Sequence, residues 1–126
     1  FVVSDLYNLP FKPESFDGII LGFWLSHEPR QNYDRLFDSI TFPLKAKGQI
    51  WLIDNNPPAE GPRRDSVGTD QFGNNLKHRR LENGDDYVII KNYFSREALE
   101  KIFSTRFHIV EVVHKDYYWS ALLRQK

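Results

Sequence analysis

The stretch SFDGIILGFWLSHEP (residues 15–29), followed by a helical run and then by KGQIWLIDNN (47–56), decides the fold of this chain. Residues 16–23 and 50–53 are short apolar runs, which is typical of buried strands. The run between them carries apolar side chains at helical spacing: Tyr33, Leu36, Phe37 and Ile40. This spacing predicts an amphipathic helix. We expect it to end near Thr41, because Pro43 follows.

A strand, a helix and a strand in this order predict a βαβ unit with parallel strands, and therefore an α/β fold. Apolar runs without polar alternation indicate strands that are covered on both faces. Ligands of such sheets bind beyond the carboxyl ends of the strands. Those ends are residues 22–27 and 54–55. The first of them combines a glycine, two aromatic rings, a hydroxyl and an imidazole, which makes it a candidate site.

The composition excludes several classes of protein. The 126 residues include 17 Lys and Arg and 17 Asp and Glu, so no basic excess indicates a nucleic-acid partner. No apolar run is long enough to span a membrane, and no signal peptide is visible. Cysteine is absent, which suits a cytoplasmic protein. The chain begins with Phe1 and contains no methionine. We therefore expect it to be a piece of a longer protein or to lack its beginning.

The remaining segments also have recognisable patterns. Residues 1–4 are prone to form a strand, and residues 56–75 predict a long loop that could serve as a lid. Asn83-Gly84 predicts a two-residue hairpin turn between strands at 77–82 and 85–91, with Glu82 opposite Asp85.

Ser95 is the predicted N-cap of a second helix, and Phe94 and Leu99 have the spacing of a hydrophobic staple around it. Residues 107–114 and 117–123 predict two strands. The connection between them is too short for anything but an antiparallel hairpin.

Several motifs together resemble those of the class I S-adenosylmethionine-dependent methyltransferases. They are SDL and LPF (4–6 and 9–11), SFDGII (15–20), FWLSHEP (23–29), LKAKGQI (44–50), and RLENG followed by YVIIK (80–84 and 87–91). Ala46 and Gln49 depart from the family's L-K-P-G-G turn. The order and spacing of these motifs are more specific than any one of them, and they cover nearly the whole chain.

The resemblance implies a partial Rossmann-like methyltransferase fold, with parallel strands and an antiparallel C-terminal hairpin. Residues 1–126 would be the C-terminal part of one such domain, and 56–93 a loop and hairpin insertion over the site. The family's strand order is 3-2-1-4-5-7-6, and residues 1–4 would be its third strand. The glycine-rich cofactor loop, G-x-G-x-G, is missing, because no two of the seven glycines have that spacing.

The resemblance also implies which residues would contact the cofactor, S-adenosylmethionine. Asp5 would accept a hydrogen bond from the adenine amino group, and the backbone N–H of Leu6 would meet the ring nitrogen. Gly22 and Phe23 would line the same site. Asp5 could instead cap the loop that follows it.

Other residues are candidates for the substrate side. His27 is the candidate general base, because a neutral imidazole accepts a proton near pH 7. It could instead cap the helix that follows. Trp24, Asp54, Arg80 and Lys91 are candidate substrate contacts, although Trp24 could equally belong to the core. No metal is expected, because the strand that ends at Gly22 offers no carboxylate to join Asp54.

These features predict methyl transfer to a small-molecule acceptor, in a protein that also has the N-terminal half of the domain. The alternative is a degenerate, non-catalytic interaction module. A nicotinamide enzyme ranks last, since the chain has no glycine fingerprint for it. Without a neighbouring strand, Ile19–Gly22 would be a bare apolar edge. We expect it to be covered by further N-terminal residues, by residues 1–4 or by another copy of the chain.

Overall fold

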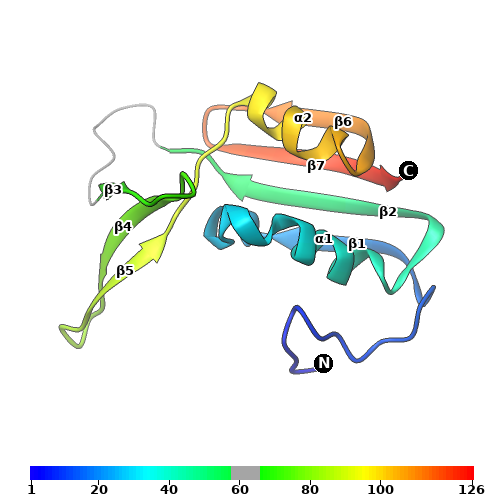
Figure 1. Cartoon of the computed structure of the whole chain (residues 1–126), viewed down its shortest axis with the longest axis horizontal. Coiled ribbons are helices and arrows are strands. Elements are labelled where there is room, and N and C mark those ends of the chain that lie inside the picture. Colours follow the sequence, from blue (N-terminus) through cyan, green and yellow to red (C-terminus); the bar gives the residue numbers. More distant parts are fainter. Residues whose placement is uncertain (58–65) are drawn as a thin grey trace.

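The computed structural model describes residues 1–57 and 66–126. Its main sheet has four strands in the order β1-β2-β7-β6. These strands are β1 (Phe16–Gly22), β2 (Leu44–Asn55), β6 (Phe107–His114) and β7 (Tyr118–Gln125). A smaller sheet of three strands lies beyond the end of β2, where its arrow points in Figure 1.

The predicted βαβ unit is confirmed. β1 and β2 are parallel, in a register that runs from Gly18 opposite Gln49 to Gly22 opposite Ile53. Helix α1 (Tyr33–Thr41) connects them and buries the four apolar side chains that predicted it. β7 pairs antiparallel with both β2 and β6, so the C-terminal hairpin is also confirmed. The observed order β1-β2-β7-β6 corresponds to the family's 4-5-7-6.

The core lies between the sheet and the two helices, α1 and α2 (Arg96–Ser104), which cover the same face (Figure 1). The ring of Phe37 on α1 meets Phe107 on β6 edge to face, with 5.2 Å between ring centroids. Ser95 caps α2 as predicted, since its hydroxyl accepts from the backbone N–H of Ala98. Both residues of the predicted staple, Phe94 and Leu99, are buried.

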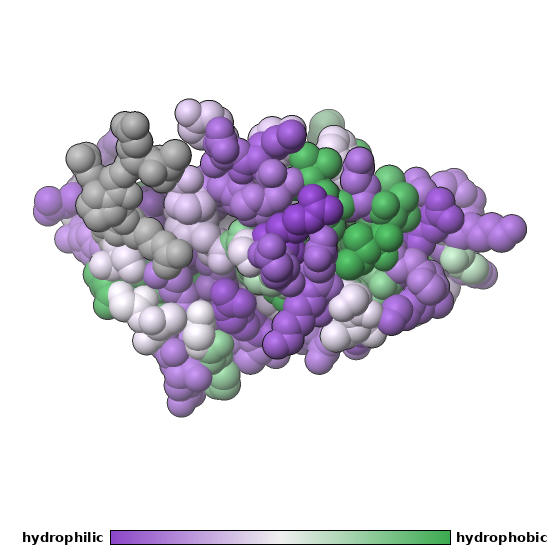
Figure 2. Space-filling model, turned by 90° about the horizontal axis from the view of Figure 1, so that it is seen from above, coloured by the Kyte–Doolittle hydropathy of each residue, from purple (hydrophilic) through white to green (hydrophobic). Residues whose placement is uncertain are grey.

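The opposite face of the sheet differs from the expectation that both faces are covered. Along β2, Ile50 and Leu52 are buried while Trp51 between them is 41% exposed. Ile20, the partner of Trp51 on β1, is 69% exposed. No described element lies over this face, which holds a shallow hollow of about 620 Å³. Seen from above, most of the surface is hydrophilic and apolar side chains gather mainly in one group (Figure 2).

β1 is an edge strand. Among the described residues it pairs only with β2, so one of the three alternatives for covering its edge, pairing with residues 1–4, is not observed. Residues 1–4 form no strand, and Phe1 and Val3 are fully exposed. A strand needs a neighbour for its backbone groups, and none of the described strands lies beside this segment. Its β-prone composition alone does not form a strand.

The segment that resembles the family's L-K-P-G-G turn, residues 44–50, lies inside β2. β2 begins at Leu44, which is opposite Phe16, whereas Gln49 is opposite Gly18. The intervening residues therefore bulge out of the ladder rather than precede the strand. A Cβ atom at Gly48 would lie only 2.9 Å from the carbonyl oxygen of Lys45, so the bulge depends on glycine.

The smaller sheet changes two further expectations. Part of the predicted loop 56–75 is a strand, β3 (Ser66–Thr69), and residues 58–65 of that loop lie outside the described residues. β3 pairs antiparallel with β4 (Asn75–Arg80), and β4 pairs with β5 (Asp86–Ile90). The expected lid is thus partly a sheet.

The hairpin between β4 and β5 has a longer turn than predicted. Arg80 is opposite Asp86, and the N–H of Leu81 donates to the carbonyl of Asp85. The loop is therefore Glu82-Asn83-Gly84, with Gly84 at φ +91°, as in three-residue hairpins. This register places opposite charges across the strands, in place of the two like charges at Glu82 and Asp85. Within residues 1–57 and 66–126, neither helix is long and apolar enough to cross a membrane.

Replacing Gly48 by alanine is expected to lower the free energy of unfolding by about 1–3 kcal/mol, the range typical of overpacking. The new Cβ would meet both the backbone of Lys45 and the side chain of Leu44. Urea denaturation measures the change. Gly18→Ala is the matched control, because its Cβ would lie 3.7 Å from the nearest atom. Equal stability of the two variants would contradict this account of the bulge.

Candidate active site

The loop that follows β1 carries the exposed groups of the candidate site. Phe23 has φ +57°, an unusual value for a residue other than glycine, and its N–H donates to the carbonyl of Ile53 at 2.8 Å. Trp24 follows, and Leu25–His27 form one turn of 3-10 helix. Leu25 and Ser26 are buried while Phe23, Trp24 and His27 are exposed. Two aromatic rings and an imidazole therefore reach the surface at the carboxyl end of β1.

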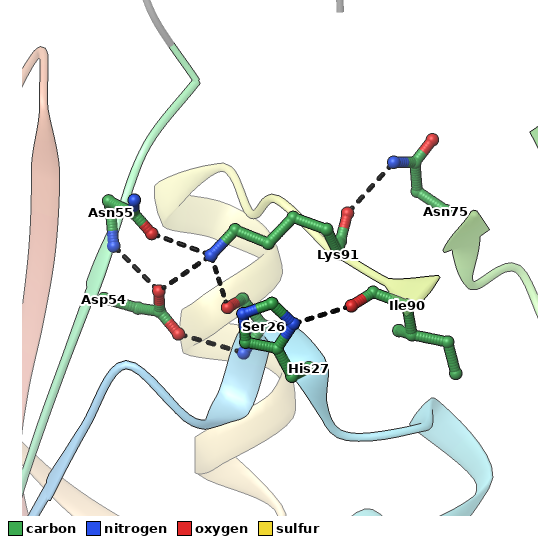
Figure 3. A network of polar contacts seen from close by, with 7 residues as sticks. All are labelled: Ser26, His27, Asp54, Asn55, Asn75, Ile90 and Lys91. Atoms are coloured by element: carbon green, nitrogen blue, oxygen red, sulfur yellow. Dashed lines mark hydrogen bonds and ion pairs between the residues drawn. The ribbon is translucent and has the colours of Figure 1, made fainter. Parts of the chain in front are cut away.

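A buried polar cluster lies beneath this loop (Figure 3). The ammonium of Lys91, just after β5, donates to Ser26 Oγ and to Asn55 Oδ1, each at 2.7 Å. It also lies 3.3 Å from Asp54 Oδ1, and Asp54 Oδ2 accepts from the backbone N–H of Ser26 at 3.0 Å. Asp54 is fully buried and Lys91 is 7% exposed. The cluster joins the ends of β1, β2 and β5.

The charges in this cluster balance. Asp54 Oδ1 accepts from the N–H of Asn55 as well as from Lys91, so the carboxylate has donors on both oxygens. An ammonium has three donors, and all three are used. The oxygens that a metal ion would need are thus occupied by Lys91. Within the part of the chain that the structure describes, no three histidine or carboxylate side chains are placed to hold a metal ion.

His27 is fixed at one side of its ring. Its Nδ1 lies 2.8 Å from the carbonyl oxygen of Ile90, the last residue of β5. Because a carbonyl only accepts, Nδ1 must carry the proton when the imidazole is neutral, which leaves Nε2 as an acceptor. The ring is exposed. The neutral ring of His27 therefore has its free lone pair on the exposed Nε2.

A second group of buried side chains, Asn74 and Asn92, anchors the small sheet to the same loop. Asn74 Oδ1 accepts from the N–H of Arg30 at 2.8 Å, and Asn92 donates its own N–H to the carbonyl of Ser26 at 2.6 Å. Both amides are fully buried. The hydrogen bond from Asn74 lowers the pKa of the Asp70 carboxyl, in the turn that precedes β4. The loop after β1 is thus held from two places on the small sheet.

Glu28 is the centre of a third polar group. This carboxylate is 3% exposed and accepts from the Tyr7 hydroxyl and, at 3.0 Å, from the indole N–H of Trp24. Burial, with a further contribution from the bond to Glu28, raises the pKa of Tyr7 to about 12. The Tyr7 phenol therefore stays protonated at neutral pH and donates. Glu28 holds the N-terminal turn against the candidate loop and orients Trp24.

The predicted cofactor residues belong to two segments, the N-terminal turn and the end of β1. Asp5 is exposed, and its Oδ1 accepts from the N–H of Tyr7 at 2.9 Å, so it caps its own turn. The carbonyl of Leu6 accepts from the Ser39 hydroxyl. Of the two carboxylate oxygens of Asp5, only Oδ1 accepts a hydrogen bond from a described residue, and Gly22 and Phe23 are exposed. All three residues are therefore accessible from solvent.

Arg80 is not brought to the site. Its side chain is 72% exposed and lies 3.4 Å from Asp86 at the outer end of the hairpin. It is five residues beyond Asn75, roughly 16 Å along the strand. The other predicted residues, His27, Trp24, Asp54 and Lys91, lie in or under the loop after β1.

Sequence patterns did not predict the side chains that complete these groups. They are Tyr7, Ser26, Glu28, Asn55, Asn74 and Asn92. A signal was available for two of them, because Ser26 and Asn55 lie at the carboxyl ends of adjacent parallel strands. No such signal marks Asn74 and Asn92, which are 18 residues apart and pair through the fold of the small sheet.

A polar pocket of about 390 Å³ opens near the end of β2. Its walls come from the residues just after β2, from the segment that leads into α2 and from the end of β6 with the turn after it, and include Asn56, Tyr93, Ser95, His114 and Lys115. This volume is within the range of small-molecule sites. The candidate loop and this pocket thus share the end of the sheet where ligands of parallel α/β folds bind.

Solved structures of other proteins show which known fold this chain has. No family model and no curated protein matches the sequence. Solved structures do match: a Methanosarcina mazei S-adenosylmethionine-dependent methyltransferase has a TM-score of 0.73 at 16% identity over 99% of this chain. A Burkholderia thailandensis 1,6-didemethyltoxoflavin-N1-methyltransferase with bound S-adenosylhomocysteine has a TM-score of 0.65 at 16% identity over 100%.

The chain has a methyltransferase fold. DhpI, solved with S-adenosylhomocysteine, matches as well, with a TM-score of 0.69 at 18% identity over 97% of this chain. The chain spans 66%, 50% and 52% of these three structures, respectively. This chain therefore matches a part of each of these structures rather than their whole length.

Replacing Tyr7 by phenylalanine is expected to lower the free energy of unfolding by about 2 kcal/mol, as for a hydrogen bond to a charged group. Urea denaturation measures it. Tyr117→Phe is the control, because this side chain is 72% exposed.

The same variant has a pH signature. The pKa of Tyr7 is about 12 in the folded chain and 10.0 ordinarily. Its contribution to stability is complete below pH 10 and is lost as the pH rises to about 12. Tyr7→Phe should therefore lose less stability over this interval than the wild type. Part of the loss should remain, since burial also raises the pKa of Tyr33 to about 12. Identical alkaline profiles of the wild type and Tyr7→Phe would contradict the assignment.

Proposed function

We propose that this chain is the C-terminal part of an enzyme that transfers a methyl group from S-adenosylmethionine to a hydroxyl of a small molecule. One observation carries the proposal. At the carboxyl end of β1, an exposed His27 is held with Nδ1 on the Ile90 carbonyl, so that Nε2 is the acceptor nitrogen of the neutral ring. The methyltransferase fold supports it, as do the structures of DhpI and the Burkholderia enzyme, which hold S-adenosylhomocysteine.

Asp5, Leu6, Gly22 and Phe23 would hold the adenine side of the cofactor. Bound S-adenosylmethionine would supply a methyl group already activated by its sulfonium. His27 Nε2 would take the proton of the acceptor hydroxyl as its oxygen attacks the methyl carbon. The remaining task of this chain is to align the acceptor and to exclude water. The polar pocket beside β2 is the proposed acceptor space.

The backbone of Phe23 gives further support. A residue other than glycine at positive φ costs about 1–3 kcal/mol, and such residues cluster at functional sites. Glycine would adopt φ +57° without this cost, but the position carries an exposed aromatic ring. The ring, with Trp24, would wall the cofactor or the acceptor.

His27→Ala is expected to lower turnover on the true acceptor by ~10²–10⁴-fold, the usual contribution of a general base. Its affinity for S-adenosylmethionine should stay unchanged, because under this proposal His27 would contact the acceptor and not the cofactor. Asp5→Ala is the complementary variant and should weaken cofactor binding. Calorimetric titration of S-adenosylmethionine into the full-length natural protein, with turnover measured beside it, tests both. No binding heat in the wild type would reject the enzyme, and unchanged affinity in Asp5→Ala would reject the adenine site.

The uncovered sheet favours a second candidate, a non-catalytic interaction module. The outer backbone groups of β1 have no described partner strand, and Gly18–Gly22 contains no charged residue or proline. Such an edge pairs readily with another strand. Under this proposal, the chain self-associates through Ile19–Gly22, with the β1 edges of two copies side by side.

Ile20→Lys is expected to convert such a dimer to a monomer, because it places two like charges at the shared edge. Light scattering during gel filtration of the 126-residue chain measures the mass. Val88→Lys is the control, since Val88 is a similarly exposed apolar residue on β5, at 59%. A wild-type chain that stays monomeric at all concentrations would rule out self-association.

A further inference from the structure

Lys91 is the described cation that is bound most completely by the protein itself. Its three donors meet Ser26 Oγ, Asn55 Oδ1 and Asp54 Oδ1 at 2.7, 2.7 and 3.3 Å. The side chain is 9% exposed. A lysine in this state has no donor left for a substrate. The geometry therefore favours a role other than the substrate contact that the sequence analysis expected.

Lys91 lies next to both partners of the bond that orients His27. The Ile90 carbonyl, which accepts from His27 Nδ1, belongs to the residue before Lys91. Ser26, which accepts from the Lys91 ammonium, is the residue before His27. One side chain thus connects the two backbones between which the His27 bond runs (Figure 3).

The backbone around Lys91 is fixed on its other side too. The N–H of Lys91 donates to the carbonyl of Asn75 at 3.0 Å, and its carbonyl accepts from Asn75 Nδ2 at 3.0 Å. Asp54 holds the N–H of Ser26 at 3.0 Å. The backbone N–H of Asn92 also donates to the carbonyl of Ser26 at 2.6 Å, so the Lys91 ammonium is the side-chain part of a double connection between the end of β5 and the loop after β1.

We propose that Lys91 is a positioning residue: through Ser26 and Asp54 it holds the Ile90 carbonyl against His27 and so fixes the tautomer that leaves Nε2 bare. The proton on a histidine goes to the nitrogen whose hydrogen-bond partner needs a donor. Without the Ile90 carbonyl in place, Nδ1 loses that partner and the Nε2–H form becomes accessible. The catalytic value of the arrangement rests on the proposed function, but the tautomer itself does not.

Position 91 requires a cation as well as a long side chain. Asp54 is fully buried, and a buried carboxylate without a positive partner is strongly unfavourable. Lys91→Met keeps the length of the chain but leaves Asp54 unpaired, so this variant could unfold for a reason unrelated to His27. The double variant Asp54→Asn/Lys91→Met removes both charges together and preserves the shapes. It separates loss of positioning from loss of folding.

Two-bond nitrogen–proton NMR spectra of the labelled 126-residue chain read the tautomer directly, and His27→Gln assigns the signal. The chain contains an internal standard. His114 Nε2 lies 2.9 Å from the carbonyl of Phe94, so this ring should carry its proton on Nε2 in every variant. Lys77→Met is the matched control, since Lys77 is a lysine of the same hairpin with no side-chain contact to the cluster.

In the wild type and in Lys77→Met, His27 should show Nδ1–H as the dominant form. In Lys91→Met, or in the double variant if the single one does not fold, Nδ1–H should become the minor form while His114 is unchanged. A folded double variant in which His27 keeps Nδ1–H would overturn the proposal. Loss of the folded spectrum in both variants would overturn it as well, because Lys91 would then serve folding rather than the histidine.

The same data distinguish this proposal from the proposed function. If the tautomer shifts as expected but the full-length protein neither binds S-adenosylmethionine nor methylates an acceptor, the positioning role stands and the enzymatic role fails. If methyl transfer depends on His27 and the tautomer ignores Lys91, the enzymatic role stands and the positioning role fails.

Discussion

The buried ion pair between Asp54 and Lys91 is the interaction on which the candidate site depends. Two charges taken out of water stabilise a fold only when the remaining hydrogen bonds are satisfied. Here Ser26 and Asn55 supply those bonds. The ends of β1, β2 and β5 must therefore meet at one point for any of the four groups to be satisfied. This requirement therefore also fixes the position of the loop from Phe23 to His27.

The sequence predicted the parts of the fold that depend on local pattern. The βαβ unit, the N-cap at Ser95 and the C-terminal hairpin follow from periodicity, capping and connection length, and all are observed. The errors concern how strands pair with one another. Residues 1–4 have strand composition but no described neighbour, and the register of β4 with β5 is set by a three-residue loop that Asn83-Gly84 alone does not reveal.

The sequence likewise predicted only a part of the candidate site, namely the residues at the ends of the strands. The strand-end rule placed His27, Trp24 and Asp54 at one end of the sheet, because the carboxyl ends of parallel strands meet there. It could not show that Lys91 would be buried among them, since that contact crosses 37 residues. Arg80, from the same hairpin as Lys91, lies at the outer end. A sequence motif alone cannot show that Lys91 lies at the inner end of this hairpin and Arg80 at its outer end, because this depends on which way the strands run in the fold.

The two faces of the main sheet differ in how well they are covered, and this difference bears on both proposed functions. One face is packed by α1 and α2, whereas the other exposes Ile20 and Trp51, on the strands whose carboxyl ends carry the site. The proposed interaction edge, Ile19–Gly22, ends at Gly22 and next to Phe23, the two residues of β1 and its loop that we propose for the cofactor. The two proposed sites would therefore be neighbours in the molecule. A partner strand along that edge would border Phe23, so association and methyl transfer need not be exclusive alternatives for this chain.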